Sequence, residues 1–182
     1  MKTIVCLNGG TATQSYNKAL TRYIANRYAT TVTWIEPVLT ALPFIVASQT
    51  TGTPAAVTTL VEQVNQADAV VIATPEYNNG PTAALKNALD WCSYAPYPLH
   101  EKPLLLMGAA TGTLGTVRAQ LMVRTILQSA ALAPHLVDTP EILVGQAGTK
   151  FDSQGNLMDQ TTVGLIDQGM QRLFQLMERG ND

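Results

Sequence analysis

The sequence predicts an α/β protein with a doubly wound parallel sheet and helices on both faces of that sheet. Two observations lead to this fold class. Short apolar runs that lack polar alternation are typical of strands buried on both faces. Along the chain, these runs alternate with segments whose apolar residues recur at three- and four-residue steps, as in helices. Strands separated by helical crossovers form parallel sheets.

The first unit is a strand, a polar loop and a helix. Residues 3–7 are short and β-branched and are bounded by the glycines that follow Asn8. Ser15 is well placed as the N-cap of the helix, because its hydroxyl can accept a hydrogen bond from a first-turn amide. The helical period then runs through Tyr16, Leu20, Tyr23, Ile24 and Arg27. Residues 31–35 alternate and are rich in branched side chains, which predicts the second strand.

A long irregular stretch opens the next unit. Residues 37–54 contain three prolines and one glycine, and connections of this length are often functional. A helical period returns at Val57, Leu60, Val61 and Val64, and an apolar strand is expected at 69–73. Pro81 then fits the first turn of a third helix, which carries Leu85, Leu89 and Cys92 on one side.

The last part of the chain continues the alternation. A fourth strand at 104–107 leads into a glycine-rich loop at 108–115. The next helix is expected to end near Ala131 and to carry on one side Val117, Leu121, Thr125 and Gln128. Residues 134–137 and 142–144 are candidate pieces of a fifth strand. A closing helix is predicted by the spacing of Val163, Ile166, Met170, Leu173 and Met177.

Five strands in this length favour the flavodoxin-like arrangement, with strand order 2-1-3-4-5, over a six-stranded dinucleotide-binding fold. One domain is expected over residues 1–182. The switch point of this order lies between the first and third strands, and ligands of open parallel sheets bind beyond the carboxyl ends of the strands there. We therefore expect one crevice formed by residues 9–17, 75–80 and 108–115.

The composition excludes several classes of partner. A net charge of -2 without a cluster of Lys or Arg gives no electrostatic basis for binding nucleic acid or an anionic membrane surface. Neither a signal peptide nor a transmembrane span is indicated, so a cytoplasmic protein is expected. Only 13% of residues are charged, about half the usual share, which favours a homodimer or homotetramer. Cys6 and Cys92 lack metal-ligand spacing and are expected to be buried thiols.

The first loop has the chemistry of a phosphate site. Its glycines let backbone amides approach an anion, its hydroxyls add donors, and the following helix N-terminus contributes a favourable dipole. The hydroxyl candidates are Thr11, Thr13 and Ser15. The loop has neither the Gly-Lys-Ser/Thr ending of a P-loop nor the Gly-x-Gly-x-x-Gly of a dinucleotide site. An ordinary glycine turn before a capped helix is the alternative.

The second and third loops suit a flat, polar ligand. Glu76 is the only carboxylate in the three loops, and without a histidine beside it we expect solvent exposure or a structural hydrogen bond rather than acid–base catalysis. Tyr77 can cover an aromatic ligand or pack under its loop, and Asn78 can donate to and accept from the edge of a heterocycle. Gly112 and Gly115 allow a close backbone approach, although an ordinary strand-to-helix turn would contain them too. No local combination of side chains indicates a metal site or a nucleophile.

The stretch after the third predicted strand carries three motifs, which are Pro75-Glu76-Tyr77-Asn78, Gly80-Pro81 and Leu85-Lys86-Asn87-Ala88-Leu89-Asp90-Trp91. Together they resemble the signature of the NADPH-dependent FMN reductase family, which contains flavin, quinone, azo and chromate reductases on a flavodoxin-like fold. Supporting similarities are Ser15-x-Asn17, Thr111-Gly112-Thr113-Leu114-Gly115 followed by Arg118-Ala119-Gln120, and Phe151-Asp152-x-x-Gly155-Asn156-Leu157.

The resemblance implies a single flavodoxin-like FMN-binding domain. It places the phosphate at Ser15 and Asn17, to which the chemistry of the loop adds Thr11 and Thr13. It places the isoalloxazine ring between the second and third loops, with contacts, mainly through backbone groups in the second loop, from Pro75, Glu76, Tyr77, Asn78, Thr111, Gly112 and Thr113. Lys86-Asn87 and Asp90-Trp91 would lie on a helix that the family uses between subunits, and Trp91 and Tyr94 are candidates for the border of a shared site.

The implied activity is that of an NAD(P)H oxidoreductase. Hydride passes from NADPH or NADH to the bound FMN, and electrons then pass to a small molecule such as a quinone, an azo compound, a flavin or a metal oxyanion. No catalytic side chain is expected, because the flavin carries the chemistry.

Two alternatives remain open. One is a flavodoxin-type FMN electron carrier that receives electrons from a protein partner. The other is a non-enzymatic binding protein that has lost tight flavin affinity. The second alternative is suggested by Gly10 and Ala12, which stand where family members usually have a serine and an arginine. Thr116 and Tyr94 depart similarly from a usual glycine and a usual arginine, and this affects the substrate side of the site.

Overall fold

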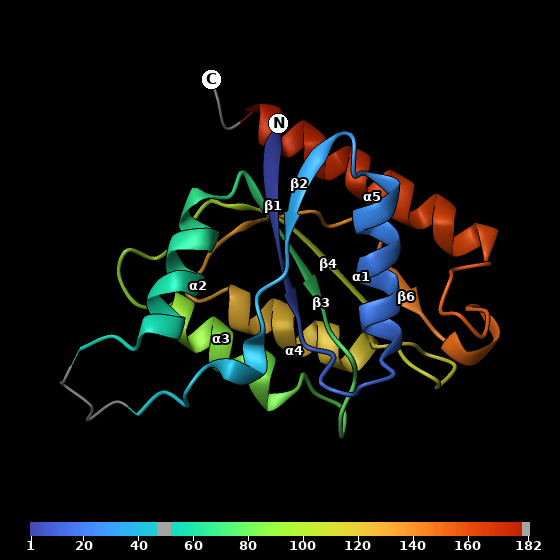
Figure 1. Cartoon of the computed structure of the whole chain (residues 1–182), viewed down its shortest axis with the longest axis horizontal. Coiled ribbons are helices and arrows are strands. Elements are labelled where there is room, and N and C mark those ends of the chain that lie inside the picture. Colours follow the sequence, from blue (N-terminus) through green and yellow to red (C-terminus); the bar gives the residue numbers. More distant parts are fainter. Residues whose placement is uncertain (47–51, 180–182) are drawn as a thin grey trace.

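A parallel sheet forms the centre of the molecule in the computed structural model, which describes residues 1–46 and 52–179. Its first four strands, in spatial order, are β2 (Val32–Ile35), β1 (Lys2–Asn8), β3 (Ala69–Ala73) and β4 (Pro103–Ala109). Each strand pairs in parallel with its neighbour, and the predicted order 2-1-3-4-5 is confirmed. The carboxyl ends of these strands therefore meet at one edge of the sheet, at the bottom of Figure 1.

Two short strands share the fifth position of the sheet. β5 (His135–Leu136) pairs with the beginning of β4, and β6 (Ile142–Val144) pairs with its end. The two predicted pieces of a fifth strand thus lie along the same side of β4, and the sheet has six strands instead of five. The connection between them contains a cis peptide bond before Pro140.

Helices cover both faces of the sheet, as predicted (Figure 1). On one face lie α1 (Tyr16–Arg27) and α5 (Gln160–Arg179). On the other face lie α2 (Ala55–Gln66), α3 (Ala83–Cys92) and α4 (Val117–Leu127). Two short 3-10 helices, η1 (Leu39–Ala41) and η2 (Ala147–Thr149), occur in the connections. None of the described helices is long and apolar enough to cross a membrane.

Alternation along each central strand divides the core into two layers, because successive side chains of a strand point to opposite faces. Ile4 and Cys6 pack on the side of α1 and α5, whereas Val5 and Leu7 pack on the side of α2, α3 and α4. Cys6 and Cys92 are both free and buried, as predicted. Burial raises the pKa of the Cys92 thiol to about 12, so this group is uncharged at neutral pH.

The packed side of α4 differs from the side named in the sequence analysis. Leu121 and Met122 are 56% and 50% exposed. The residues that face the core are instead Ala119, Gln120, Val123 and Leu127. The polar Gln120 is buried because its amide donates to the carbonyl of Ile142, at 3.0 Å, and so joins α4 to the edge strand β6. The period of α4 was therefore recognised, but its orientation was wrong.

One further boundary also differs from the expectation. The third helix begins at Ala83 and not at Pro81, because the hydroxyl of Thr82 caps it by accepting from the Leu85 amide at 3.4 Å. The irregular stretch predicted at 37–54 contains η1, and its residues 47–51 lie outside the described part of the chain.

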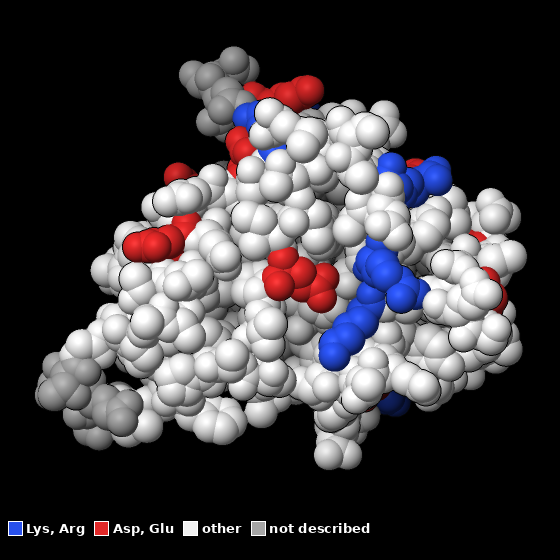
Figure 2. Space-filling model, in the orientation of Figure 1, with Lys and Arg blue, Asp and Glu red and all other residues white. Residues whose placement is uncertain are grey.

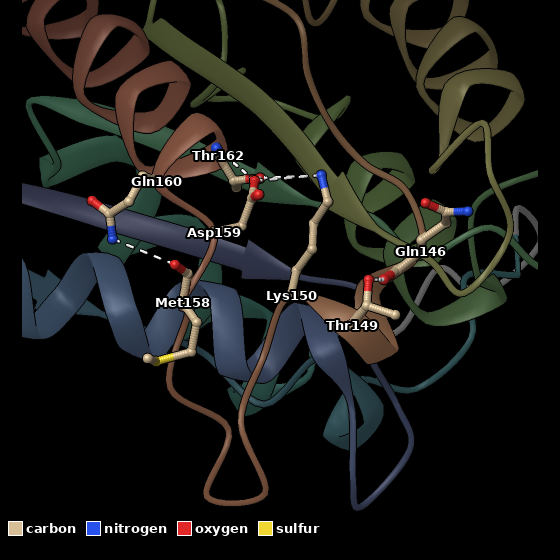
Figure 3. Close-up of polar contacts among 7 residues, drawn as sticks. All are labelled: Gln146, Thr149, Lys150, Met158, Asp159, Gln160 and Thr162. Carbon is tan, nitrogen blue, oxygen red and sulfur yellow. Dashed lines mark hydrogen bonds and ion pairs between the residues drawn. The ribbon is translucent and has the colours of Figure 1, made fainter.

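A carboxylate caps the long closing helix (Figure 3). One oxygen of Asp159 accepts from the backbone amide of Thr162 at 2.8 Å and from the hydroxyl of the same residue. The ammonium of Lys150 lies 3.5 Å from that oxygen. The hydrogen bonds from Thr162 lower the pKa of Asp159, since they favour its ionised form.

We predict that Asp159→Ala destabilises the fold by about 1 kcal/mol at pH 7, which is a typical value for a lost N-cap. The folded-state pKa of Asp159 lies below its unfolded-state value of about 3.9. The contribution of the carboxylate is therefore present above about pH 4 and is lost as the pH falls through the folded-state pKa. Urea unfolding at a series of pH values should show the difference between the two proteins shrinking as the pH falls below about 4, and a difference that does not shrink there would contradict this assignment.

Candidate functional site

Three loops meet at the carboxyl edge of the sheet: residues 9–15 after β1, 74–82 after β3 and 110–116 after β4 (Figure 1). Backbone hydrogen bonds hold them together at their bases. The Gly9 amide donates to the carbonyl of Ala73 at 2.8 Å, and the Thr74 amide donates to the carbonyl of Met107 at 2.9 Å. The Thr82 hydroxyl also donates to the Gly9 carbonyl at 2.9 Å. The structure thus brings the three predicted segments to one place.

The first loop presents a series of free backbone donors. Within the described residues, none of the backbone N–H groups of residues 11–17 donates a hydrogen bond to protein. The hydroxyls of Thr11 and Thr13 are exposed and also have no partner there. The hydroxyl of Ser15 caps α1 by accepting from the Lys18 amide at 3.4 Å. Consecutive free amides at a helix N-terminus are a favourable environment for an anion.

Asn17 lies deeper than the other residues predicted for the phosphate. Its side chain is buried, donates to the carbonyl of Ala109 and accepts from the amide of the same residue, both at 2.9 Å. These two bonds tie the start of α1 to the end of β4. The predicted contribution of Asn17 to phosphate binding therefore depends on its backbone N–H.

Gly10 lies close to the side chain that caps the following helix. A Cβ on Gly10 would collide with the hydroxyl of Ser15, and the Gly10 amide donates to the side chain of Asn8 at 2.8 Å. The amide of Asn8 donates in turn to Glu36 at 3.0 Å. Gly10, which stands where family members usually have a serine, thus leaves room for the Ser15 cap.

A cavity of about 150 Å³, which no motif in the sequence indicates, lies beside the first loop. It is lined by Gly10 and Thr11 of the loop, Lys18 of α1 and Glu36, together with residues 37–40. Figure 2 shows basic residues gathered over α1 and an acidic group over the segment after β2. Lys18 makes no ion pair in the described part of the chain. A cation therefore lies near the loop although Ala12 stands where relatives usually carry an arginine.

The second loop is a tight hairpin turn. Tyr77 and Gly80 exchange two backbone hydrogen bonds of 2.8 and 3.0 Å, and the residues between them, Asn78 and Asn79, have positive φ angles of 49° and 67°. Both angles are those of a type I′ turn, in which asparagine is favoured. Pro75 is buried at the base, whereas Asn78 is exposed and Tyr77 is 50% exposed. The amides of Glu76 and Asn78 donate no hydrogen bond within the described residues.

The side chain of Glu76 points to α4 and not to the crevice. One carboxylate oxygen accepts from the amides of Arg118 and Ala119 at 2.9 and 3.1 Å. The other oxygen lies 3.4 Å from the Arg118 guanidinium. This is the structural hydrogen bond that the sequence analysis expected. Because the carboxylate is already engaged and no histidine accompanies it in the loops, it is not arranged as a general acid or base.

The third loop is exposed and open at Thr111, Gly112 and Thr113. A Cβ on Gly112 would meet no atom within 4 Å. The amides of residues 111–114 make no hydrogen bond in the described part of the chain. A flat ligand could therefore approach this backbone closely and find donors there.

A segment that the sequence analysis missed supports the third loop. The amides of Gln146 and Ala147 donate to the carbonyls of Gly112 and Ala110, both at 3.0 Å. A Cβ on Gly145 would collide with the carbonyl oxygen of Thr113. Gly145, directly after the last predicted strand piece, was the one available signal of this close approach.

The second half of the matched signature is engaged in structural contacts. Asn87 and Trp91 both donate to the carbonyl of Pro43, at 3.0 and 2.8 Å, and Asn87 accepts from the Ile45 amide at 3.0 Å. Lys86 and Asp90 form an ion pair of 2.7 Å one turn apart. Asn87 and Trp91 thus hold the segment after η1 against α3. Among the described residues, no group of His, Cys, Asp and Glu could hold a metal ion.

These features fit FMN. The free amides and hydroxyls of the first loop suit a phosphate dianion, and the second and third loops present free amides around an open space for a flat heterocycle.

Comparison with known proteins agrees with this arrangement. A quinone reductase of Escherichia coli is 43% identical over 117 residues, which is 63% of this chain and 61% of that protein. Subunit 2 of an NADH-dependent flavin reductase of Lactobacillus johnsonii is 30% identical over 181 residues, or 97% of each chain. The structure of FerB, an NAD(P)H:(acceptor) oxidoreductase flavoenzyme of Paracoccus denitrificans, superposes with a TM-score of 0.87 at 22% identity and covers 98% of each chain.

The alignments with curated relatives of 40–43% identity span 61–65% of the length of those proteins. The family model of the NADPH-dependent FMN reductases matches residues 2–149, which include all three loops. The chain therefore belongs to the NADPH-dependent FMN reductase family.

Proposed function

We propose that this chain forms a single FMN-binding domain and acts as an NAD(P)H oxidoreductase that reduces a small molecule, such as a quinone, an azo compound, a flavin or a metal oxyanion. The observation that carries the proposal is the row of unpartnered backbone amides at residues 11–17. They lie next to the second and third loops, in a chain that belongs to the NADPH-dependent FMN reductase family. FMN, when bound, supplies the redox chemistry, and the protein supplies binding, orientation and electrostatics.

The proposed phosphate site and the proposed ring site lie at two ends of the crevice and involve different residues. The amides of residues 11–17, with the hydroxyls of Thr11, Thr13 and Ser15, hold the phosphate. The amides of Glu76 and Asn78 and those of residues 111–113 would donate to the polar edge of the ring, and Pro75 and Gly112 would lie beside it. Tyr77, which is half exposed, would cover part of the ring. No side chain is assigned a proton transfer.

Absorbance and turnover test this proposal together. The protein, as purified or after addition of FMN, should show the visible bands of oxidised flavin and should oxidise NADH or NADPH when a quinone is present. Absence of NAD(P)H oxidation with every member of a quinone panel would contradict the proposal. Bound flavin that NAD(P)H reduces only slowly would indicate an electron carrier. A colourless protein that takes up no FMN would indicate a binding protein of another kind.

We predict that the double variant Thr11→Ala, Thr13→Ala binds FMN at least tenfold more weakly, while its affinity for riboflavin is unchanged. Each hydroxyl would donate to a charged oxygen, and such bonds contribute roughly 1.5–3 kcal/mol. Thr58→Ala, Thr59→Ala on α2 is the control, since it removes two exposed threonine hydroxyls far from the loops in sequence. Fluorescence titration provides the affinities. Equal losses for FMN and riboflavin would show that these threonines do not bind the phosphate.

We also propose a homo-oligomer, a dimer or tetramer, whose interface includes the exposed face of α4. Leu121 and Met122 on α4 and Leu114 in the third loop are 50–59% exposed. The sulfur of Met122 lies close to Gly80 of the second loop, 3.1 Å from where a Cβ of that residue would be. The apolar surface is thus continuous with the crevice, and a second copy placed there would cover both.

Light scattering should therefore give a mass of two or four chains, and Leu121→Glu should shift it to that of one chain, since a charge buried in an interface is costly. Met158→Glu, at a methionine that is 60% exposed outside α4, should leave the mass unchanged. A wild-type monomer, or a shift with Met158→Glu alone, would refute this interface.

The compartment is part of the proposal as well. Two buried cysteines that form no disulfide suit the reducing cytoplasm, where thiols persist. We propose neither nucleic acid nor membrane as a partner.

A further inference from the structure

The helix α4 lacks a cap from its own N-cap residue. Thr116 occupies the N-cap position, but its side chain makes no capping bond. Its hydroxyl is buried and accepts instead from the side chain of Gln120 at 3.0 Å. The first-turn amides of a helix need an acceptor from outside the helix. The hydroxyl of Thr116, which would usually be that acceptor, is instead bonded to Gln120.

Glu76 takes over this role from another loop. The amides of Arg118 and Ala119 are the second and third of the helix, the two that an N-cap oxygen normally accepts from. Both donate to one oxygen of Glu76, 42 and 43 residues away in the chain. The side chain of Glu76 is only 13% exposed, and its negative charge lies at the positive end of the helix dipole. The guanidinium of Arg118 is more than half exposed and adds little.

The contact of Glu76 with α4 lies between two of the loops that form the crevice. Glu76 belongs to the loop that carries Pro75, Tyr77 and Asn78. The two amides from which Glu76 accepts lie just after the third loop, residues 110–116. Thus one carboxylate joins the two segments that flank the crevice at the ring end. The bases of the second and third loops also lie close together at Gly108. A Cβ on this residue would collide with the carbonyl of Thr74 and with the hydroxyl of Thr116.

We propose that Glu76 is a positioning residue that sets the width of the ring-binding slot between the second and third loops. This inference rests on the proposed function, because it assumes that the slot holds the flavin ring. Glu76 touches the ring through its backbone at most; its side chain acts through α4. Loss of the carboxylate frees the start of α4 to move away from the second loop, and the amides of the two loops no longer face the ring at the same separation.

The chain offers a matched control in Asp159 (Figure 3). Asp159 also caps a helix through one carboxylate oxygen, which accepts from the Thr162 amide at 2.8 Å, and it also has a neighbouring cation, Lys150. The partners of Asp159 belong to none of the three loops. Asp159→Ala therefore removes the same kind of interaction without touching the slot.

The experiment compares Glu76→Ala, Glu76→Gln and Asp159→Ala with the wild type, by titration with FMN and with riboflavin. We expect Glu76→Ala to weaken the binding of both ligands by the same factor of at least ten, because the ring is common to both. Glu76→Gln, which keeps an acceptor oxygen but loses the charge, should restore part of this loss. Asp159→Ala should change neither affinity by more than twofold, although it too lowers the melting temperature.

Visible circular dichroism of the bound flavin supplies a second measurement, because it reports the surroundings of the ring. The spectrum should change in Glu76→Ala and stay as in the wild type in Asp159→Ala. If Glu76→Ala does not fold, Glu76→Gln alone decides, with an expected loss of at least threefold for both ligands. Unchanged affinities and spectrum in a folded Glu76 variant would overturn the proposal, whereas a wild type that binds no flavin would refute the proposed function itself.

Discussion

The parallel pairing of β1, β3 and β4 is the constraint on which the candidate site depends. Three adjacent strands that run in one direction end at the same edge of the sheet. After each strand, the chain leaves the sheet through a loop that leads to a helix. The bonds from Gly9 to Ala73 and from Thr74 to Met107 extend this pairing one residue beyond the strands. Every loop therefore starts from a position fixed by its neighbour, and the crevice follows from the sheet.

The three loops use their polar backbone groups in different ways. In the second loop, the backbone groups of Tyr77 and Gly80 form hydrogen bonds with each other. The third loop is held by hydrogen bonds from the segment around Gln146. The first loop is fixed mainly by side chains, with Asn8 at its start and Asn17 at its end. Its amides stay free as a result. Buried asparagines at both ends thus keep a donor-rich backbone in place without using its donors.

Periodicity was sufficient to predict the strands, because buried runs and helical spacing are local properties of the chain, whereas their order followed from the number of strands and the rule for doubly wound sheets. It could place 134–137 and 142–144 as pieces of one strand, and both pair with β4. The orientation of α4 was not predictable in this way. Its packed side contains Gln120, which is buried only because an edge carbonyl, that of Ile142, accepts from it.

The site shows the same limit. The loops themselves were predicted, since glycines, hydroxyls and the matched motifs mark them in the sequence. The contacts of Glu76 with α4, of Asn17 with Ala109 and of Gln146 with Gly112 join residues 34 to 92 positions apart. Such partners are known only when the sheet has brought them together. A capping residue is sought within a few positions of its helix, so a cap supplied by a distant loop leaves no local signal.

The free amides of the first loop also affect the distance over which this protein attracts an anion. Partial charges on N–H groups act over a few ångströms, whereas a full cation such as an arginine acts over a Debye length, about 8 Å at physiological ionic strength. Ala12 leaves the loop itself without a cation, but Lys18 of α1 lines the cavity beside it. Salt should therefore lower the rate at which a dianion is captured, because that rate depends on the charge of Lys18, and should have less effect on the hydrogen bonds of the amides once the dianion is in contact.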